Sequence, residues 1–162
     1  MTATAGRIDT EIAFFDYQKH IRGVWAIEQQ QFKEHAFSRD ELRICMADPK
    51  NAGRVLLCRG EVIGFIIERF HTFDVEIISI AVEPTFVRFG FGRRMIQNCI
   101  DRALRTAGNT GRRRIWTTVS ERNVIAQHFL HACGFQWCHT IPGGFDSAGQ
   151  PNDGYQFVKA IT

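Results

Sequence analysis

The chain has 162 residues, of which 44% are hydrophobic and 23% charged, and its formal net charge is +3. This balance excludes a disordered chain and predicts one globular domain, residues 1–162, with a hydrophobic core of its own. Residues 1–6 lack the apolar stretch of a secretion signal, and no apolar run approaches the length of a membrane span. We therefore expect a cytoplasmic protein that does not enter a membrane.

Basic and metal-ligating residues do not form the motifs of two further classes. The run 112–114 is Arg-Arg-Arg, but no aromatic interleaving or nucleic-acid motif surrounds it. We expect a solvated loop there, or one that assists with phosphates, and no nucleic-acid partner. The five cysteines form no Cys-x-x-Cys, which suits reduced side chains. One group of potential zinc ligands matches no standard finger, so we expect no metal; it comprises His128, His131, Cys133, Cys138 and His139.

Hydrophobic periodicity and turn residues predict an alternation of strands and helices. In chain order we expect a strand at 11–15, helices at 17–32 and after Ser38, strands at 53–59 and 62–70, a strand and a helix within 75–107, a strand at 114–119, a helix from Asn123 to Gly134, and strands at 135–141 and 155–160. Hairpins followed by a β-α-β crossover indicate an α/β or α+β fold on a mixed sheet.

The stretch 75–107 organises the rest of the chain. An apolar strand ends at Pro84, and an amphipathic helix follows a turn that carries glycines. The helix is expected to bury Met95, Ile96, Cys99, Ile100, Ala103, Leu104 and Ala107. Its outer face is expected to carry Arg93, Arg94, Gln97, Asn98, Asp101, Arg102 and Arg105, and Gly108 is expected to end it.

The turn before this helix predicts an anion site. Gly90 and Gly92 allow the backbone to approach a ligand closely, and the free N–H groups at the helix start point at that position. Arg88, Arg93 and Arg94 add positive charge. The third glycine of a Rossmann fingerprint and the Gly-Lys-Ser/Thr of a Walker loop are both absent. The strand, the Gly-x-Gly and the basic helix start together favour a pyrophosphate as the anion.

Two motifs resemble those of a known family. IAVEP at 80–84 followed by RFGFGR at 88–93 resembles motif A of the GNAT superfamily, the acetyl-CoA-dependent N-acetyltransferases. NVIA at 123–126, continued by CGF at 133–135, resembles the second signature of that family. Val87 stands where the family loop has Gln or Arg. The resemblance covers about residues 12–161 and is strongest to the RimI type, which acetylates protein N-termini.

The resemblance implies a fold and a cosubstrate. The GNAT fold has a mixed, mostly antiparallel sheet of about six to seven strands flanked by about four helices, and acetyl-CoA is the cosubstrate. In this family the strand backbone holds the pantetheine arm like an added strand, the glycine turn holds the pyrophosphate, and the asparagine of the second signature contacts the pantetheine. The implied cofactor-binding residues are Ile80, Ala81, Val82, Arg88, Phe89, Gly90, Phe91, Gly92, Arg93 and Asn123.

Glu76 and Tyr155 are the catalytic candidates. Transfer needs a neutral amine, and an N-terminal amine titrates at about 7.7–8.0 against about 10.4 for lysine. Glu76 lies on the motif A strand, where the RimI-like pattern often carries a glutamate that acts as base through water; taken alone, it also fits a solvent-facing residue. Tyr155 follows Asp153–Gly154 much as a tyrosine follows Asp-Ala in eukaryotic N-terminal acetyltransferases. It fits a substrate clamp, a substitute acid or a core tyrosine.

Several positions depart from the RimI-type pattern. Leu130 stands where that type has a tyrosine aimed at the departing sulfur, and Thr118 replaces a second glutamate. Gly144 and Phe145 replace paired tyrosines that clamp the peptide. We expect acetyl transfer to a primary amine, first of all a peptide or protein N-terminal α-amine. Acetylation of a small-molecule amine and a catalytically degenerate acyl-CoA-binding module remain alternatives, as do a monomer and a homodimer.

Overall fold

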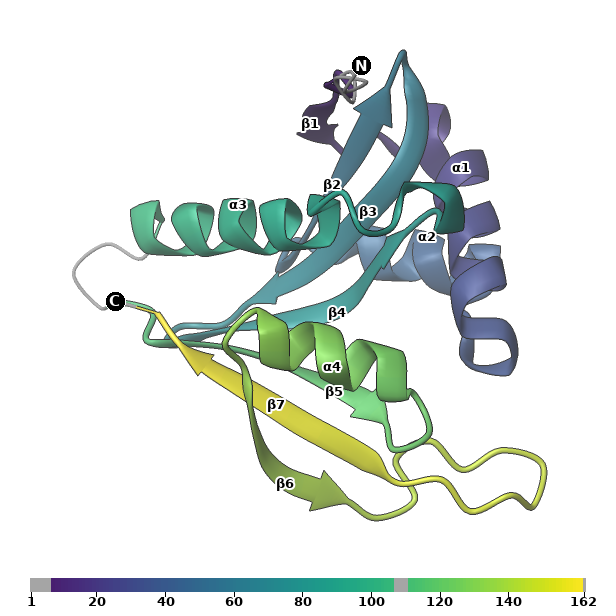
Figure 1. Ribbon diagram of the computed structural model, residues 1–162, viewed down its shortest axis with the longest axis vertical. Coiled ribbons are helices and arrows are strands. Elements are labelled where there is room, and N and C mark those ends of the chain that lie inside the picture. The colour runs from purple at the N-terminus through teal and green to yellow at the C-terminus, as the bar shows by residue number, and fades with distance from the viewer. Residues whose placement is uncertain (1–6, 107–110, 162) are drawn as a thin grey trace, which may run out of the picture.

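The computed structural model describes residues 7–106 and 111–161, which form one seven-stranded sheet with helices on both faces (Figure 1). The strand order is β1-β2-β3-β4-β5-β7-β6, and of the neighbouring pairs only β4 and β5 are parallel. The strands are β1 (Glu11–Phe14), β2 (Asn51–Cys58), β3 (Glu61–Phe70), β4 (Asp74–Val82), β5 (Arg114–Ser120), β6 (Gln136–Ile141) and β7 (Gly154–Ala160). The helices are α1 (Tyr17–Phe32), α2 (Arg39–Ala47), α3 (Phe91–Arg105) and α4 (Val124–Ala132), with short 3₁₀ turns η1 (Lys33–His35) and η2 (Pro84–Phe86). The fold class expected from the sequence is confirmed.

Local sequence explains where these helices begin. Asp16 caps α1 by accepting a hydrogen bond from the amide of Lys19. Ser38 and Glu41 form a capping box at the start of α2, each side chain accepting from the other residue's backbone. Such side chains satisfy amides that have no partner inside the helix. The predicted end of the α3 helix at Gly108 lies outside the described residues.

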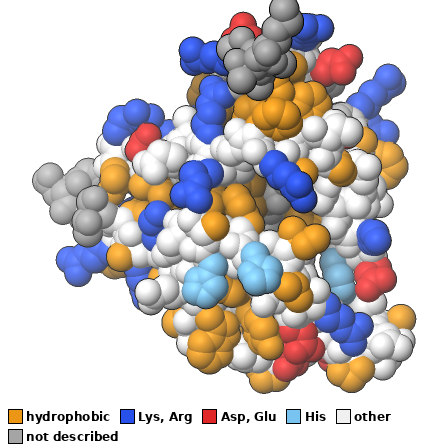
Figure 2. Space-filling view, in the orientation of Figure 1, with side chains coloured by type: hydrophobic (Ala, Val, Ile, Leu, Met, Phe, Trp, Pro, Cys, Tyr) orange, Lys and Arg blue, Asp and Glu red, His pale blue; other side chains and the backbone are white. Residues whose placement is uncertain are grey.

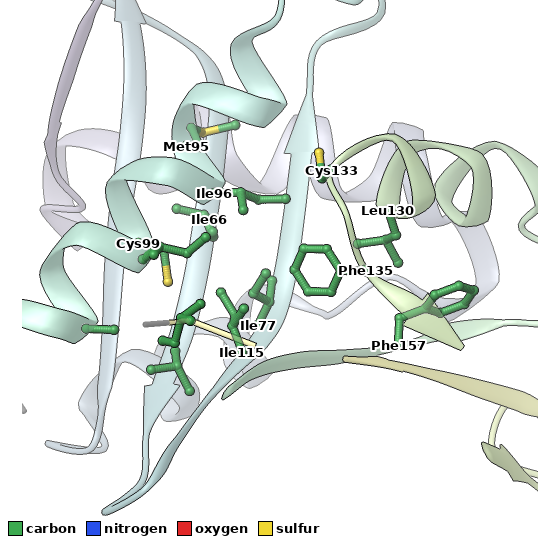
Figure 3. Close-up of a cluster of buried hydrophobic side chains, with 14 of the residues drawn as sticks. Ile66, Ile77, Met95, Ile96, Cys99, Ile115, Leu130, Cys133, Phe135 and Phe157 are labelled. Atoms are coloured by element: carbon green, nitrogen blue, oxygen red, sulfur yellow. The ribbon is translucent and has the colours of Figure 1, made fainter. Parts of the chain in front are cut away.

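The helices divide between the two faces of the sheet. α3 and α4 lie over one face, and the side chains that they bury with the sheet form the cluster in Figure 3. Its members include Ile66, Ile77, Met95, Ile96, Cys99, Ile115, Leu130, Cys133, Phe135 and Phe157. On the other face, α1 and α2 bury a second cluster that includes Val24, Ile27, Leu42, Val55, Phe65 and Ile67. Among the described residues, no helix is long and apolar enough to span a membrane.

The pairing of β4 with β5 is short, and this shapes the site. The register runs from Asp74 opposite Arg114 to Ile77 opposite Thr117 and stops there, so the two strands diverge beyond that point. On its other side β4 continues along β3, but Ile67 lies opposite Ser79 while Glu68 lies opposite Ile77, which leaves one extra residue in β4. Such a β-bulge bends the strand that carries it. β4 therefore bends at the position where it separates from β5.

Arg102 corrects one prediction about α3. The helical pattern placed it on the outer face, but it is buried and forms an ion pair with Glu68 of β3. Asn98 accepts a further hydrogen bond from its Nε at 2.9 Å. Leu104, expected inside, is 39% exposed instead. The pattern failed here because a fully buried carboxylate on a neighbouring strand recruits a cation from a position that periodicity assigns to solvent.

The arginine run after α3 fits its prediction of a solvated loop only at Arg113, which is exposed and lies outside any strand. Arg112 donates to the carbonyls of His71 and Ala103 and lies over the ring of Phe70, with 5.0 Å from guanidinium carbon to ring centroid. Arg114 forms an ion pair with Asp74 at 3.2 Å. These two arginines join β5 to the β3–β4 connection and to the end of α3, so they are structural rather than part of a free loop.

We expect Arg102→Met to lower the free energy of unfolding by about 3–5 kcal/mol, because it leaves Glu68 buried without its partner. The measurement is urea unfolding followed by circular dichroism. Arg105→Met is the matched control, since Arg105 is exposed on the same helix, and it should change stability by less than about 0.5 kcal/mol. Equal stability of the two variants would show that the buried pair does not support the fold.

Candidate active site

The divergence of β4 from β5 exposes one edge of β4. We call residues 78–82 of this strand the open edge. Glu83 donates its amide to the carbonyl of Ile63 on β3 at 2.8 Å, and hydrogen-bonded pairs alternate along antiparallel strands. The register therefore turns the N–H and C=O groups of Ile80 and Val82 away from β3, toward the gap left by β5. Gln31 of α1 donates to the Val82 carbonyl at 3.3 Å. The arrangement can accept an extended ligand as an added strand.

A turn that carries Gly90 and Gly92 follows the open edge, and we call residues 88–92 the glycine turn. Arg88 and Gly90 have positive φ angles of 74° and 78°, which curl the turn, and α3 begins directly after Gly90. The first helical amide to find an intrahelical acceptor is that of Arg94, bonded to the carbonyl of Gly90. α3 has no side-chain cap, whereas α1, α2 and α4 each have one. The free amides and the helix dipole at this end favour an anion.

The arginines expected at this turn divide into two groups. The Arg93 guanidinium donates to the carbonyl of Ala132 at the end of α4, at 2.8 Å, and that of Arg94 bonds to Thr10. Arg88 is exposed, and no side-chain hydrogen bond is found for it in the described part of the chain. Figure 2 shows more basic than acidic side chains on the face over α3. Arg88 and the backbone amides are thus the groups best placed for an anion, with Arg93 and Arg94 contributing charge nearby.

α4 packs closely against the start of α3. A Cβ added to Gly92 would lie 2.9 Å from the ring of Phe129, so only glycine allows this approach. Phe91 is buried beneath the turn, while Phe89 stacks on it and stays 55% exposed. Asn123 caps α4 through its side-chain oxygen, which accepts from the amide of Ala126 at 3.1 Å. Its Nδ2 group therefore remains the donor for any ligand.

Glu76 lies on the face of the sheet that α1 and α2 cover. Its neighbours Val75 and Ile77 both point into the core beneath α3, so alternation turns Glu76 the other way. Its carboxylate is half-buried and lies 3.4 Å from the Nε2 atom of His71. Glu76 is still paired with Trp116 of β5, before the strands diverge. Four residues separate it from Ile80, about 13 Å along an extended strand.

Tyr155 lies at the open end of the sheet and on the opposite face. It is half-buried against the core beneath α3 and α4, and it pairs with Val119 of β5. Val119 is three residues beyond Trp116, the partner of Glu76, which corresponds to about 10 Å along the strand. The structure therefore does not bring Glu76 and Tyr155 into direct contact.

Leu130 does not point at the open edge. It is 2% exposed and lies among Phe135 and Phe157 in the core (Figure 3). A tyrosine there would need room that the core does not offer, because added volume in a packed interior forces its neighbours to move. The RimI type has at this position a tyrosine aimed at the departing sulfur, whereas here the side chain is buried in the core.

Two segments far apart in sequence meet beside the open edge. We call residues 33–38, between α1 and α2, the acceptor-side segment. His35 in this segment packs edge-on against Phe145 of the β6–β7 loop, with ring centroids 5.4 Å apart. Its Nε2 atom lies 3.5 Å from the side-chain Nδ2 atom of Asn152. Ser120, at the end of β5, donates to the Asn152 oxygen at 2.7 Å. No local pattern predicts this contact, because it joins the α1–α2 connection to the distant β6–β7 loop.

Comparison with known proteins identifies the family. The family model described as "Acetyltransferase (GNAT) family" matches residues 13–135. The chain therefore belongs to the GNAT family and is an N-acetyltransferase. A search of curated protein sequences finds no significant match.

Several solved structures share the fold. The ribosomal-protein-S18-alanine N-acetyltransferase from Escherichia coli has a TM-score of 0.80 at 18% identity and covers 95% of both chains. Ard1 from Thermoplasma volcanium has a TM-score of 0.79 at 18% identity, covering 94% of this chain and 98% of its own. The spermidine/spermine N-acetyltransferase SpeG from Vibrio cholerae has a TM-score of 0.71 at 17% identity, covering 94% and 92%. Residues 7–106 and 111–161 contain no group of three or more His, Cys, Asp or Glu side chains placed to hold a metal.

Gly90→Ala should weaken coenzyme A binding by about tenfold or more, because alanine resists the positive φ that curls the glycine turn. Gly60→Ala is the matched control. Gly60 also has a positive φ, 80° against 78°, and neither glycine has an atom within 4 Å of an added Cβ. Both variants carry a similar backbone strain, but Gly60 lies in the β2–β3 hairpin. Isothermal calorimetry with coenzyme A measures the difference, and equal affinities would place the anion elsewhere.

Proposed function

We propose that this protein transfers the acetyl group of acetyl-CoA to a primary amine, first of all the N-terminal α-amine of a peptide or protein. The observation that carries the proposal is the open edge of β4 leading directly into the uncapped start of α3. An extended pantetheine arm fits the backbone groups of Ile80 and Val82, and its pyrophosphate fits the free amides beyond Gly90. One cosubstrate, acetyl-CoA, supplies both chemical groups in this order. The family supports the same choice.

In the proposed reaction the amine nitrogen attacks the thioester carbonyl. A C–N bond forms, the C–S bond breaks, and coenzyme A leaves as a thiolate. The amine must lose a proton, and Glu76 is the proposed base. Because it lies about 13 Å along β4 from Ile80, it acts through intervening water rather than by direct contact. His71 lies beside the carboxylate and orients it.

Tyr155 is the proposed source of the proton for the thiolate. It lies at the open end of the sheet, on the face that α3 and α4 cover, and its ring is only half-buried. The phenol of a tyrosine can donate to a thiolate, and a positioned acid contributes about 10²–10⁴-fold to such a step. Leu130, which stands where the RimI type has its acid, is apolar and buried. Tyr155 therefore replaces it in the proposal.

The acceptor is proposed from chemistry and from related folds. An α-amine titrates at about 7.7–8.0, so it loses its proton more readily than a lysine at about 10.4 and makes less demand on a distant base. Proteins of this fold include an enzyme for a ribosomal-protein alanine and one for spermidine and spermine. The first supports a protein N-terminus as the acceptor, and the second supports a small amine as the alternative.

One observation favours a second function. Leu130 fills the acid position with a core side chain, and Thr118 leaves no carboxylate on β5 beyond the point of divergence. A chain that binds acetyl-CoA without transferring its acetyl group would show these features. Binding without turnover would distinguish this function from catalysis.

Incubation with acetyl-CoA and three acceptor sets tests the proposal: peptides with free N-termini, N-terminally blocked lysine peptides, and polyamines. Mass spectrometry of each acceptor should show a gain of one acetyl group on the α-amine peptides, with release of free thiol. Acetylation of polyamines alone would establish the alternative acceptor. Coenzyme A binding without any product would establish the binding function, and no binding would contradict the proposal as a whole.

Glu76→Gln should lower kcat/KM for the acceptor by about 10²-fold or more, most strongly below the pKa of the acceptor amine, where a base is needed. Coenzyme A affinity should not change. Glu61→Gln is the control, because Glu61 is an exposed carboxylate on the neighbouring strand β3. Rates across pH 6–9 measure the effect. A Glu76→Gln enzyme with an unchanged pH profile would exclude this carboxylate as the base.

A further inference from the structure

Glu28 of α1 is a buried carboxylate that the proposed mechanism does not use. It is 1% exposed. One carboxylate oxygen accepts the backbone amide of Phe37 at 3.1 Å, and the other accepts the Ser79 hydroxyl at 2.9 Å. No Lys, Arg or His nitrogen lies within 4 Å of it in the described part of the chain. The residue is thus hydrogen-bonded but has no counter-ion.

Burial of a carboxylate without a counter-ion is costly, and carboxylates with perturbed pKa values cluster at functional sites. Burial raises the pKa of Glu28, and the hydrogen bonds from Phe37 and Ser79 oppose that rise. The surrounding elements present mostly apolar side chains, such as Leu42 on α2 and Ile67 on β3. Cys45 of α2 lies near enough to be affected by the charge of Glu28, although burial is the main cause that raises the pKa of its thiol.

The two partners of Glu28 belong to the two sides of the proposed acceptor site. Ser79 lies on the open edge, beside the bulge and just beyond the last residue that pairs with β5. Phe37 lies in the acceptor-side segment, where Gln29 also holds its carbonyl at 2.9 Å. Glu28 and Gln29 therefore fix both backbone groups of Phe37 from adjacent positions on α1. One carboxylate ties the open edge to the acceptor-side segment.

We propose that Glu28 is a positioning residue for acetyl transfer, which orients the Ser79 hydroxyl toward the acceptor amine and holds the acceptor-side segment against the open edge. This inference rests on the proposed function. When Glu28 is ionised, the hydroxyl donates to it, and the lone pairs of the Ser79 oxygen are free to accept an N–H of the amine. When Glu28 is protonated, it donates to Ser79 instead. The hydroxyl hydrogen then turns outward and opposes the hydrogens of the amine.

Glu28→Gln tests this arrangement with little change of shape. Its amide oxygen can still accept from Phe37, but its NH₂ group donates to Ser79 and reverses that hydrogen bond. We expect kcat/KM for the acceptor to fall about tenfold, mainly through KM, while coenzyme A affinity is unchanged. In the wild type, protonation of Glu28 should lower kcat/KM at low pH. This part of the pH dependence should be absent in Glu28→Gln. Glu61→Gln, which changes an exposed carboxylate at the start of β3 outside the proposed site, is the control and should leave the profile unchanged.

Ser79→Ala separates positioning from folding. It removes the hydroxyl and keeps the bond between Glu28 and Phe37, so it should reproduce the loss of acceptor affinity. In the double variant Glu28→Gln/Ser79→Ala the losses should not add, because both act through the same hydroxyl. Additive losses, or a uniform fall at every pH together with weaker coenzyme A binding, would mean that Glu28 only supports the fold and would overturn the proposal.

A measurement without turnover covers the case of an inactive protein. In ¹H–¹⁵N NMR spectra the amide of Phe37 should shift with pH with a midpoint above the ordinary glutamate value, because burial raises the pKa of Glu28. The shift should vanish in Glu28→Gln and persist in Glu61→Gln. Absence of the titration in the wild type would overturn the proposal. Failure of coenzyme A binding would contradict the proposed function instead, so the two failures are distinguishable.

Discussion

β4 and β5 share only four register positions, from Asp74 opposite Arg114 to Ile77 opposite Thr117. The two strands then separate, and the bulge in β4 bends it where the pairing ends. A parallel pair in the middle of a sheet normally satisfies both of its strands along their length. Here the separation leaves the backbone groups of Ile80 and Val82 without a strand partner on that side. Every part of the candidate site is placed relative to this gap.

The helices differ in whether a side chain caps their first turn. α1, α2 and α4 begin at side chains that satisfy their first amides. α3 begins at Gly90 without such a side chain, and its first amides face outward at the end of the gap. Gly92 then allows α4 to approach through Phe129. A strand edge for an extended arm and a helix start for an anion are thus continuous.

Two buried glutamates show how the fold treats charge. Glu68 is fully buried and meets the guanidinium of Arg102, an ion pair that joins β3 to α3. Glu28 is equally buried but meets only a hydroxyl and a backbone amide. The first carboxylate is compensated by a cation on the helix that packs over it. The second lies beside the gap and has no cation, so its ionisation acts on Ser79 and on the acceptor-side segment.

Much of this organisation is encoded locally. The alternation of strands and helices, the bounds of α1 and the cap at Ser38 follow from periodicity and capping chemistry, and the glycine turn with its motif indicated the family. Glu28 also left a local signal, because it falls on the same helical stripe as the buried Ile21 and Val24. A charged residue at such a position predicts a buried polar partner.

Other features were decided only by the tertiary structure. Arg102 is buried because Glu68 lies on a strand that packs beneath α3. Leu130 is buried because α4 packs it against Phe135 and Phe157. Helical periodicity predicts which face of a helix is apolar but not how deeply each residue on that face is buried. The separation of Glu76 from Tyr155 depends on which strands pair and in what register. The sequence by itself thus determined the elements, the family and the glycine turn that begins α3, because these depend on neighbours along the chain. Side-chain partners across the sheet depend on contacts between distant segments, which local pattern does not contain.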